Sequence, residues 1–198
     1  ATDDPEIVHS NADSVISKPL DSNQSGGFSP SSIGSLVLWL DANDSQNITV
    51  NSNNVVTSWG DKSGNERNAT LESGSPQFSP NGGPLGMPHV QFRRASGEDF
   101  LKVGGPSFFA KHMIYVCRSP YPTWNYYGGI LGHQSGRNSN YLFQHGNKGF
   151  HSNRYPAAVM KNGSDLSSTN AFDLSPLDQF MILEIVVDDQ SSSNKSTY

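Results

Sequence analysis

The sequence has a single cysteine, Cys117, among its 198 residues. The chain therefore forms no internal disulfide, which excludes the class of small secreted proteins that disulfide bridges hold together. Cys117 closes an apolar run that begins at Met113. In that setting a cysteine behaves as a small hydrophobic residue, so we expect a buried thiol and not a nucleophile.

Positive charge is scarce and is never clustered. The chain has 13 Lys and Arg against 18 Asp and Glu, a formal net charge of −5. Nucleic acids and anionic membrane surfaces are recognised by clustered cations, so we expect neither to be the main partner. No apolar run approaches the roughly 20 residues of a membrane span, so membrane insertion is not expected.

Charged residues of both signs make up only 16% of the chain, and Ser, Asn and Gly supply much of its polarity. These are residues of turns and loops. Residues 1–33 hold few apolar side chains, which predicts a flexible arm or linker before one domain at residues 34–198. The first residue is alanine, so we expect a processed chain from a secreted or cell-surface protein.

Short runs of β-branched and aromatic residues recur along the domain without a convincing helical stripe. Ile48–Val50 and Val55–Trp59 flank the polar stretch Asn51–Asn54, which predicts a β-hairpin. Residues 72–88 are rich in proline and glycine and predict a long irregular loop. Many short strands predict an all-β fold, an antiparallel β-sandwich. Further strands are expected at Leu36–Leu40, His89–Phe92, Phe100–Val103, Met113–Arg118, Gly129–Gly132, Tyr141–His145, Ala157–Lys161 and Phe180–Asp188.

Three motifs occur in order within residues 36–103. They are Leu38–Ala42 (LWLDA), Trp59–Thr70 (WGDKSGNERNAT) and Pro88–Leu101, which begins PHVQF and ends DFL. Together they resemble the opening of bacterial laminin-G-like domains of the concanavalin A-like lectin and glucanase superfamily. The resemblance implies a jelly roll of two antiparallel sheets, with ligands held at the concave face or at edge loops.

The motif residues also have a structural interpretation. Large aromatics dominate core burial, so Trp39 and Trp59 are expected in the core. Asp61–Asn65 is typical of a tight turn in which the Asp61 carboxylate accepts hydrogen bonds from nearby backbone N–H groups and Gly64 or Asn65 takes a positive φ. Asp41 is expected to do the same after its strand.

One motif departs from the family pattern. Where the pattern has an acidic FDG.DD stretch, this chain has Arg93 directly after Phe92, and the acids that remain are Glu98 and Asp99. In related folds this region contributes calcium ligands, so the resemblance implies calcium as a cofactor, with Glu98 and Asp99 as candidate metal ligands. Calcium takes six to eight oxygen ligands, so two neighbouring acids need distant partners to form a site.

Aromatic rings alternate with amides, imidazoles and guanidinium groups between residues 119 and 155. Flat rings can stack on sugar faces, while the polar groups hydrogen-bond to hydroxyls, a combination of apolar walls and a few oriented polar groups that is common in ligand sites. Two other interpretations stay open: inward-facing strand residues, and a protein-interaction patch. The candidate ligand-binding residues are Tyr121, Trp124, Tyr126, Tyr127, His133, Arg137, Asn140, His145 and Arg154.

Catalysis has weaker support. Glu184 and Asp188 are four residues apart and would share one face of a strand, as the carboxylates of β-glucanases do. The E-x-D-x-x-E motif of those enzymes is absent, because positions 186 and 187 are both valine. Gln144-His145 and Arg154-Tyr155 supply the residue types of a polysaccharide lyase without its motifs. His133, His145 and His151 are close in sequence but lack the spacing of zinc sites.

The expected core comprises Leu36–Leu40, Trp59, Val90, Phe92, Met113–Val116 and Met181–Val187. The strand Phe180–Asp188 precedes a polar stretch and what we interpret as the start of a return strand at Ser196–Tyr198. A sandwich that stopped there would leave 180–188 as an open edge, which is an aggregation hazard. We therefore expect an interrupted sandwich at Tyr198, with a second chain or the rest of the protein completing the sheet.

These observations together favour an extracellular carbohydrate-binding or adhesion module, lectin-like and without catalysis, whose partner is a polysaccharide or other glycan. The alternative is a structural or protein-interaction module of a surface or virion assembly. A polysaccharide hydrolase or lyase is the third possibility.

Overall fold

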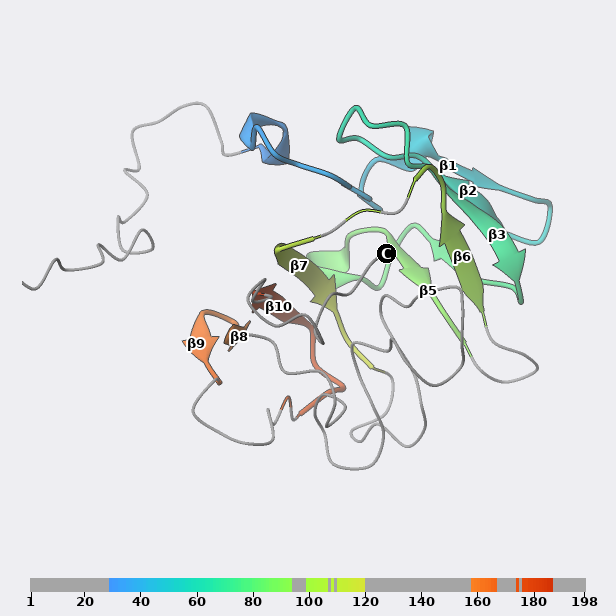
Figure 1. Ribbon diagram of the computed structural model, residues 1–198. Coiled ribbons are helices and arrows are strands. Elements are labelled where there is room, and N and C mark those ends of the chain that lie inside the picture. The colour runs from blue at the N-terminus through green and yellow to red at the C-terminus, as the bar shows by residue number, and fades with distance from the viewer. Residues whose placement is uncertain are drawn as a thin grey trace, which may run out of the picture.

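The fold is all-β and antiparallel, as expected from the sequence. A computed structural model describes residues 29–93, 99–106, 108, 110–119, 158–166, 174 and 176–186. Every strand pair in this part of the chain is antiparallel. Its helices are single 3-10 turns, at η1 (Pro30–Ser32), η2 (Ser45–Asn47) and η3 (Pro84–Gly86). Figure 1 shows two groups of strands, one on the right around β1, β2, β3 and β6 and one on the left around β7 to β10.

The first sheet has four strands in the order β1-β2-β3-β6. Its first two strands form the hairpin expected around Asn51–Asn54. The turn forms because the Asn51 Oδ1 accepts hydrogen bonds from the backbone N–H groups of Asn53 and Val55, while Asn54 takes a φ of 58°, which asparagine tolerates. The strands are β1 (Ile48–Val50), β2 (Val56–Trp59), β3 (Ala69–Ser73) and β6 (Phe100–Val103).

The second sheet has the order β7-β10-β8-β9. The link between its last two strands is Asn162-Gly163, with φ values of 51° and 79°, which is the asparagine–glycine signature of a type I′ hairpin turn. A smaller two-stranded sheet pairs β4 (Gln77–Ser79) with β5 (His89–Gln91), and an isolated bridge from Val55 to Gln77 joins it to the first sheet. The strands of the second sheet are β7 (His112–Cys117), β8 (Ala158–Lys161), β9 (Ser164–Asp165) and β10 (Met181–Val186).

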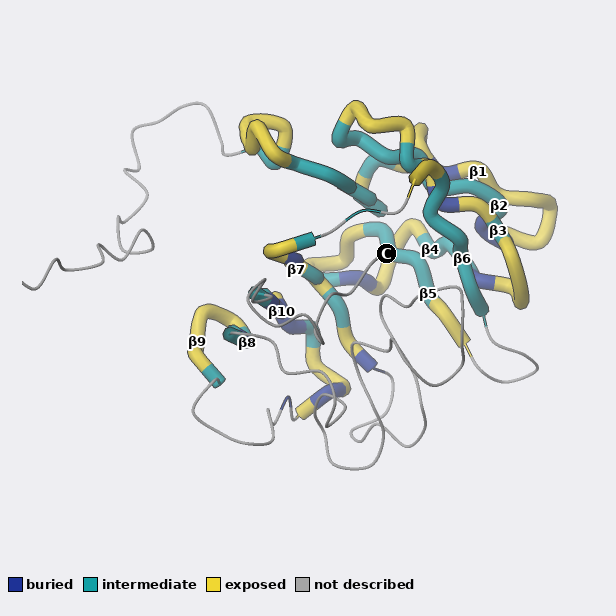
Figure 2. Tube along the Cα trace, viewed as in Figure 1, coloured by how far each residue is buried: buried dark blue, intermediate teal, exposed yellow. Residues whose placement is uncertain are grey.

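The main core lies against one face of the second sheet. Alternate residues of β10 are buried, because successive side chains of a strand point to opposite faces. Leu174 and Leu177, from the segment before β10, cover that face. Figure 2 shows the buried positions as dark blue stretches within the teal and yellow tube. The core residues are Met113, Val159, Leu174, Leu177, Met181, Leu183 and Ile185.

Several expected core positions are wrong. Phe92 is 48% exposed, and the strands β7 and β10 bury only every second residue, so that Ile114, Val116 and Ile182 are exposed. Continuous apolar runs in β7 and β10 do not reveal which face a neighbouring segment covers. Trp39 and Trp59 are only partly buried.

Two expected elements are also wrong. Residues 36–40 do not pair as a strand, although the run is apolar and of strand length. Residues 72–88 are not one irregular loop, because β3 continues to Ser73 and β4 forms at Gln77–Ser79. The prolines and glycines that suggested a loop instead flank this short strand. Only Phe78 within the strand is strongly apolar, so no apolar alternation indicated a strand here.

The expected open edge at the end of the chain is wrong as well. Strand β10 pairs with β7 on one side and with β8 on the other, so it is a central strand of its sheet. Residues 181–186 therefore need no further strand beside them. The predicted arm and the predicted strands Gly129–Gly132 and Tyr141–His145 lie outside the described residues.

Candidate functional site

The predicted ligand-binding residues, from Tyr121 to Arg154, all lie outside the part of the chain that the structure describes. Glu98 also lies outside it, which leaves Asp99 as the described member of the predicted site. The segment that carries the predicted ligands connects β7 to β8. Both strands run antiparallel to β10, so the two ends of this connection are anchored at opposite ends of the second sheet.

Asp99 holds two chain segments together. Its Oδ1 accepts a hydrogen bond from the Ser75 backbone N–H at 2.6 Å, and its Oδ2 accepts one from the Arg93 backbone N–H at 2.5 Å. Its own N–H donates to the Arg93 carbonyl at 3.2 Å. Both carboxylate oxygens therefore already have structural partners. Among the described residues, no group of three or more His, Cys, Asp or Glu side chains is arranged to hold a metal ion.

Asp61 is the centre of the motif region. Its Oδ1 accepts hydrogen bonds from the backbone N–H groups of Trp39 and Ser63, both at 2.9 Å. Its Oδ2 accepts from the Ser63 hydroxyl at 2.7 Å and from the Arg67 N–H at 3.1 Å. Burial raises the pKa of this carboxyl, but these four hydrogen bonds favour the charged form more strongly and the pKa is lowered overall. Asp61 therefore acts as the turn residue expected from the sequence, and Gly64 takes the expected positive φ of 88°.

The same turn explains why residues 36–40 are extended without being a strand. The Asn65 Nδ2 donates to the carbonyl oxygens of Leu36 and Val37, at 2.9 and 3.2 Å. The Lys62 backbone N–H donates to the Trp39 carbonyl at 2.8 Å. The run's polar backbone groups are thus partly satisfied by a turn and not by a neighbouring strand. Hydrogen bonds therefore hold the turn at Asp61–Asn65 against the extended run at residues 36–40.

Lys62 lies where the LWLDA motif meets the turn. Its Nζ is 2.9 Å from the Asp41 Oδ2 and 3.0 Å from the Asp44 Oδ2, and 4.3 Å from the centre of the Trp39 ring. Its hydrogen bonds to the two carboxylates raise the pKa of Lys62, and the hydrogen bond from Lys62 lowers the pKa of Asp44. Sequence reasoning missed this cluster. The acids of LWLDAND, together with the lysine of the turn motif, were its only signal.

Glu184 was the acid of the alternative glucanase hypothesis. It is opposite Ile114 on β7 and opposite Met160 on β8, so the two positions directly beside it carry apolar side chains. Its Oε1 is 2.5 Å from the Nε2 of His112. Asp188, its proposed partner, lies outside the described residues.

Cys117 is packed against the core of the second sheet. Burial raises the pKa of its thiol to about 11. At neutral pH the sulfur is protonated, and the thiolate is the nucleophilic form. Cys117 is therefore a partly buried residue packed against the core, as the apolar run indicated, and its low reactivity stays a prediction.

Comparison with known proteins finds no matching protein family, no matching curated protein and no matching solved structure. In the described part of the chain, no helix is long and apolar enough to cross a membrane.

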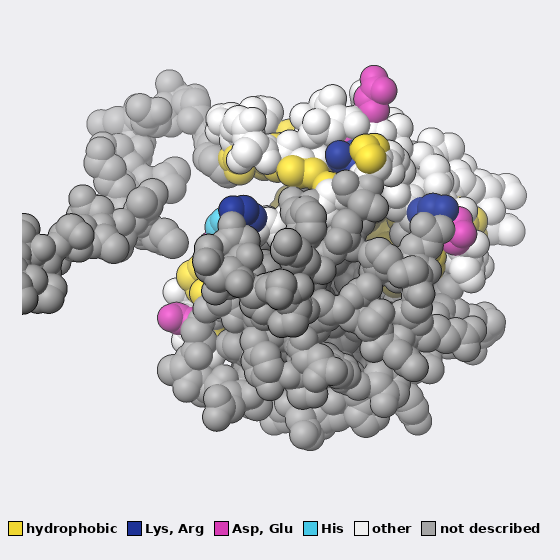
Figure 3. Space-filling view, viewed as in Figure 1, with side chains coloured by type: hydrophobic (Ala, Val, Ile, Leu, Met, Phe, Trp, Pro, Cys, Tyr) yellow, Lys and Arg dark blue, Asp and Glu magenta, His cyan; other side chains and the backbone are white. Residues whose placement is uncertain are grey.

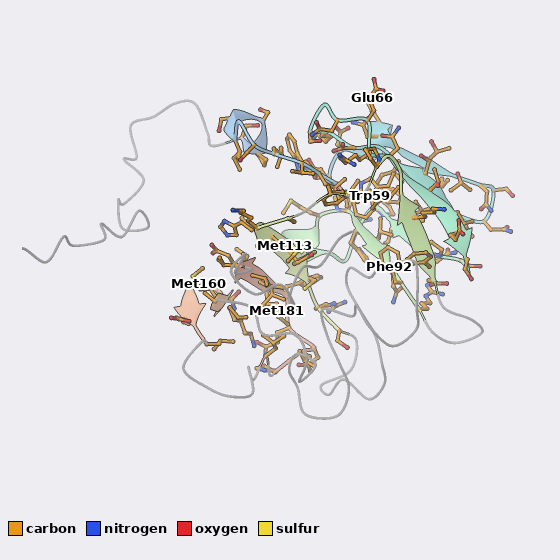
Figure 4. All side chains as sticks on the ribbon, viewed as in Figure 1. Trp59, Glu66, Phe92, Met113, Met160 and Met181 are labelled. Atoms are coloured by element: carbon orange, nitrogen blue, oxygen red, sulfur yellow. The ribbon has the colours of Figure 1, made fainter. Side chains whose placement is uncertain are left out.

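Figure 3 shows the described Lys and Arg side chains on the visible face as separate spots and not as one patch. Figure 4 places Trp59 among the strands of the first sheet, and Met113, Met160 and Met181 among those of the second.

Proposed function

We propose that this protein is a non-catalytic carbohydrate-binding or adhesion module that works outside the cell. The observation that carries the proposal is the density of aromatic, amide, imidazole and guanidinium side chains between Tyr121 and Arg154. Aromatic rings supply apolar stacking surfaces, and the polar groups supply the oriented hydrogen bonds that a sugar needs.

The scaffold is consistent with this assignment. The two four-stranded antiparallel sheets are our proposed layers of the jelly roll that the motifs imply. The motif residues Asp61, Lys62 and Asn65 are engaged in contacts within the scaffold. This division of roles supports a ligand site on the connection between β7 and β8 and not on the motifs themselves, because binding residues are disproportionately placed on loops that a rigid scaffold positions.

Glycan-array binding tests the proposal. We expect the intact chain to bind one class of glycan and the Trp124→Ala variant to lose that binding. Phe92→Ala is the matched control, because Phe92 is a half-exposed aromatic outside the candidate segment, and its binding should equal that of the unmodified chain. Absence of binding to any glycan, or equal loss in both variants, would contradict the proposal.

Two further measurements address the remaining parts of the assignment. Incubation with a panel of polysaccharides should release neither reducing ends nor unsaturated uronates, because the proposed module has no catalytic role.

Repeating the glycan array with a chelator tests whether calcium contributes, with Glu98 and Asp99 as the candidate ligands. Loss of binding that added calcium restores would support a metal-assisted site.

The second candidate function is a structural or protein-interaction module within a larger surface assembly. It is favoured by the large aliphatic side chains that β7 and β10 expose. Contiguous apolar surface on a folded domain often marks a site of contact with another protein.

A further inference from the structure

Two asparagines in the chain, Asn81 and Asn162, are followed directly by glycine. Glycine has no side chain to hinder its backbone nitrogen, which can therefore reach the side-chain amide of the preceding asparagine. Attack at this amide expels ammonia and closes a succinimide ring, and water then opens the ring to aspartate or isoaspartate. Both asparagines and the glycines after them are exposed to solvent. Whether each site reacts therefore depends on its local backbone and hydrogen bonds.

The backbone at Asn162 opposes the attack. Asn162 and Gly163 form the type I′ turn between β8 and β9, with φ values of 51° and 79°. The first central residue of such a turn has a ψ of about +30°, which turns the Gly163 nitrogen away from the Asn162 side chain. The Asn162 Oδ1 also accepts a hydrogen bond from the Ile182 N–H at 2.8 Å, which directs the amide toward β10. We expect Asn162 to be stable in the folded protein.

Asn81 lies in the loop between β4 and β5 and has neither restraint. Its φ is not positive, and among the described residues neither its side-chain amide nor the Gly82 N–H has a hydrogen-bond partner. The Ser79 hydroxyl donates to the Asn81 carbonyl at 2.7 Å, and the Gly83 N–H donates to the Met87 carbonyl at 2.9 Å. The two reacting groups are thus free, while hydrogen bonds hold the backbone on either side of them.

The imidazole of His89 lies beside Gly82. His89 is opposite Ser79 in the β4–β5 pair, and a Cβ atom at Gly82 would lie 3.4 Å from the His89 Cε1. Cε1 is bonded to both ring nitrogens, so this edge of the ring brings a nitrogen close to the glycine backbone. The Nδ1 is buried and has no hydrogen-bond partner among the described residues, which is unusual for a buried polar atom. A neutral imidazole can accept a proton, so His89 can act as a base here.

We propose that Asn81 is a site of spontaneous self-modification. The Gly82 nitrogen attacks the Asn81 Cγ and forms a new C–N bond, while its proton passes to His89. The Cγ–Nδ2 bond then breaks, and the Nδ2 group takes up a proton from His89 and leaves as ammonia. Water adds to one of the two succinimide carbonyls and gives aspartate or isoaspartate at position 81. Transfer of the proton through a positioned side chain accelerates such a step.

The modification changes the chemistry of the β4–β5 loop. Residues 73–92 contain no Lys, Arg, Asp or Glu, so the new carboxylate would be the first acidic group in this segment. Isoaspartate would also pass the backbone through the former side chain, which adds a methylene group to the main chain. The site lies outside the candidate glycan-binding residues, and the inference does not depend on the proposed function.

Peptide mapping by mass spectrometry during incubation of the intact chain at neutral pH tests the site. In the folded chain we expect Asn81 to convert at least about tenfold faster than Asn162, because the turn at Asn162 misplaces the reacting atoms. In guanidinium chloride the turn is lost, and the two sites should convert at similar rates. An unmodified Asn81 after prolonged incubation of the folded chain, or similar rates at the two sites in that chain, would overturn the proposal.

His89→Gln tests the base. Glutamine keeps a polar side chain but has no imidazole, so conversion of Asn81 in the folded variant should slow by about fivefold or more. The variant and the unmodified chain should react alike in guanidinium chloride, which separates the role of the folded imidazole from a change in local sequence. Circular dichroism checks folding, with His89→Asn as a second variant, and His112→Gln is the control that should leave the rate unchanged. Undiminished conversion of Asn81 in the folded His89 variants would show that His89 is not the proton acceptor.

Discussion

Asp61 is the residue on which most of the motif region depends. One carboxylate joins residues 39, 63 and 67 through four hydrogen bonds, and the neighbouring Lys62 bridges to Asp41. A partly buried carboxylate is well suited to this role, because it offers several acceptor sites on two oxygens. An asparagine side chain could not accept all four hydrogen bonds, because its amide has one oxygen and an NH₂ group that only donates.

Asp61→Asn should lower the free energy of unfolding by about 1–3 kcal/mol, since the substitution leaves at least one donor without its acceptor. Urea unfolding measures the change. Glu72→Gln, at an exposed position of β3, is the control and should be within about 0.5 kcal/mol of the unmodified chain. Equal stability of the Asp61 variant would contradict the role of this carboxylate.

The lowered pKa of Asp61 also predicts a pH dependence. A carboxyl whose pKa is lower in the folded state contributes stability above its unfolded pKa, and this contribution is lost as the pH falls through the folded pKa. The loss should begin near the ordinary carboxyl pKa of 3.8 and continue below it. Between pH 5 and the lowest pH at which the protein still folds, the unmodified chain should therefore lose more stability than Asp61→Asn. Parallel curves for the two proteins would show that Asp61 does not contribute.

Cys117 should react slowly with a thiol reagent in the folded protein at pH 8. Its pKa of about 11 leaves little thiolate at that pH, and the side chain is packed against the core. In denaturing urea the reaction should be fast and complete. Rapid modification of the folded chain would mean that residue 117 is exposed.

At the scale of single elements, β10 is an inner strand of the second sheet. It is paired on both sides and buries Met181, Leu183 and Ile185 on one face. The alternate residues face the other way, which explains why a strand that is almost continuously apolar has both the most buried and some of the most exposed aliphatic side chains among the described residues.

Leu183→Ala should therefore lower the free energy of unfolding by about 2–5 kcal/mol, the range for removing a buried leucine side chain. Leu85→Ala removes the same atoms from a fully exposed position and should change the stability by less than about 0.5 kcal/mol. Chemical denaturation of both variants gives the comparison. Similar effects of the two substitutions would mean that the Leu183 side chain is not buried in the core.

The β8–β9 turn gives a second test at this scale. Gly163 has a φ of 79° with open space around its Cβ position, so Gly163→Ala should cost about 1 kcal/mol through backbone conformation alone. Gly34 also has open space but lacks a positive φ, and Gly34→Ala is the matched control, with little or no loss expected. Thermal unfolding resolves the difference. Equal effects of the two substitutions would exclude the left-handed turn.

At the scale of the whole molecule, the strand order determines which backbone amides are protected from hydrogen exchange with solvent. Because β10 is central in its sheet, its amides should exchange with solvent more slowly than those of β9, which lies at the sheet's edge. Hydrogen exchange followed by mass spectrometry or NMR measures this. Alternating fast and slow amides along β10 would indicate one unpaired side and would restore the original expectation of an open edge.

Local chemistry allowed much of the architecture to be predicted from the sequence. The β1–β2 hairpin, β6, the turn at Asp61 and the approximate positions of β5, β7, β8 and β10 follow from β-branched runs and from the preferences of Asn, Asp and Gly in turns. Strand β3 and the short polar strands β4 and β9 were missed, since Gln, Ser, Asp and Glu are weak strand formers and pairing with a neighbour decides such cases. The candidate ligand residues were selected by composition alone and remain a prediction.

The sequence by itself determined that the chain is all-β and where most of its turns lie, because each of these depends on side chains a few residues apart. Only the tertiary structure decided that residues 36–40 bond to a turn and not to a strand, that β10 is central, and that one side of β7 and β10 is buried while the other is exposed. A strand's alternation defines two faces, but which face is covered depends on the segments that pack against it. For β10 these are Leu174 and Leu177 just before the strand, together with Met113 of β7 and Val159 of β8, which are distant in sequence. These features depend on contacts between segments far apart in the sequence, and local residue patterns do not specify such contacts.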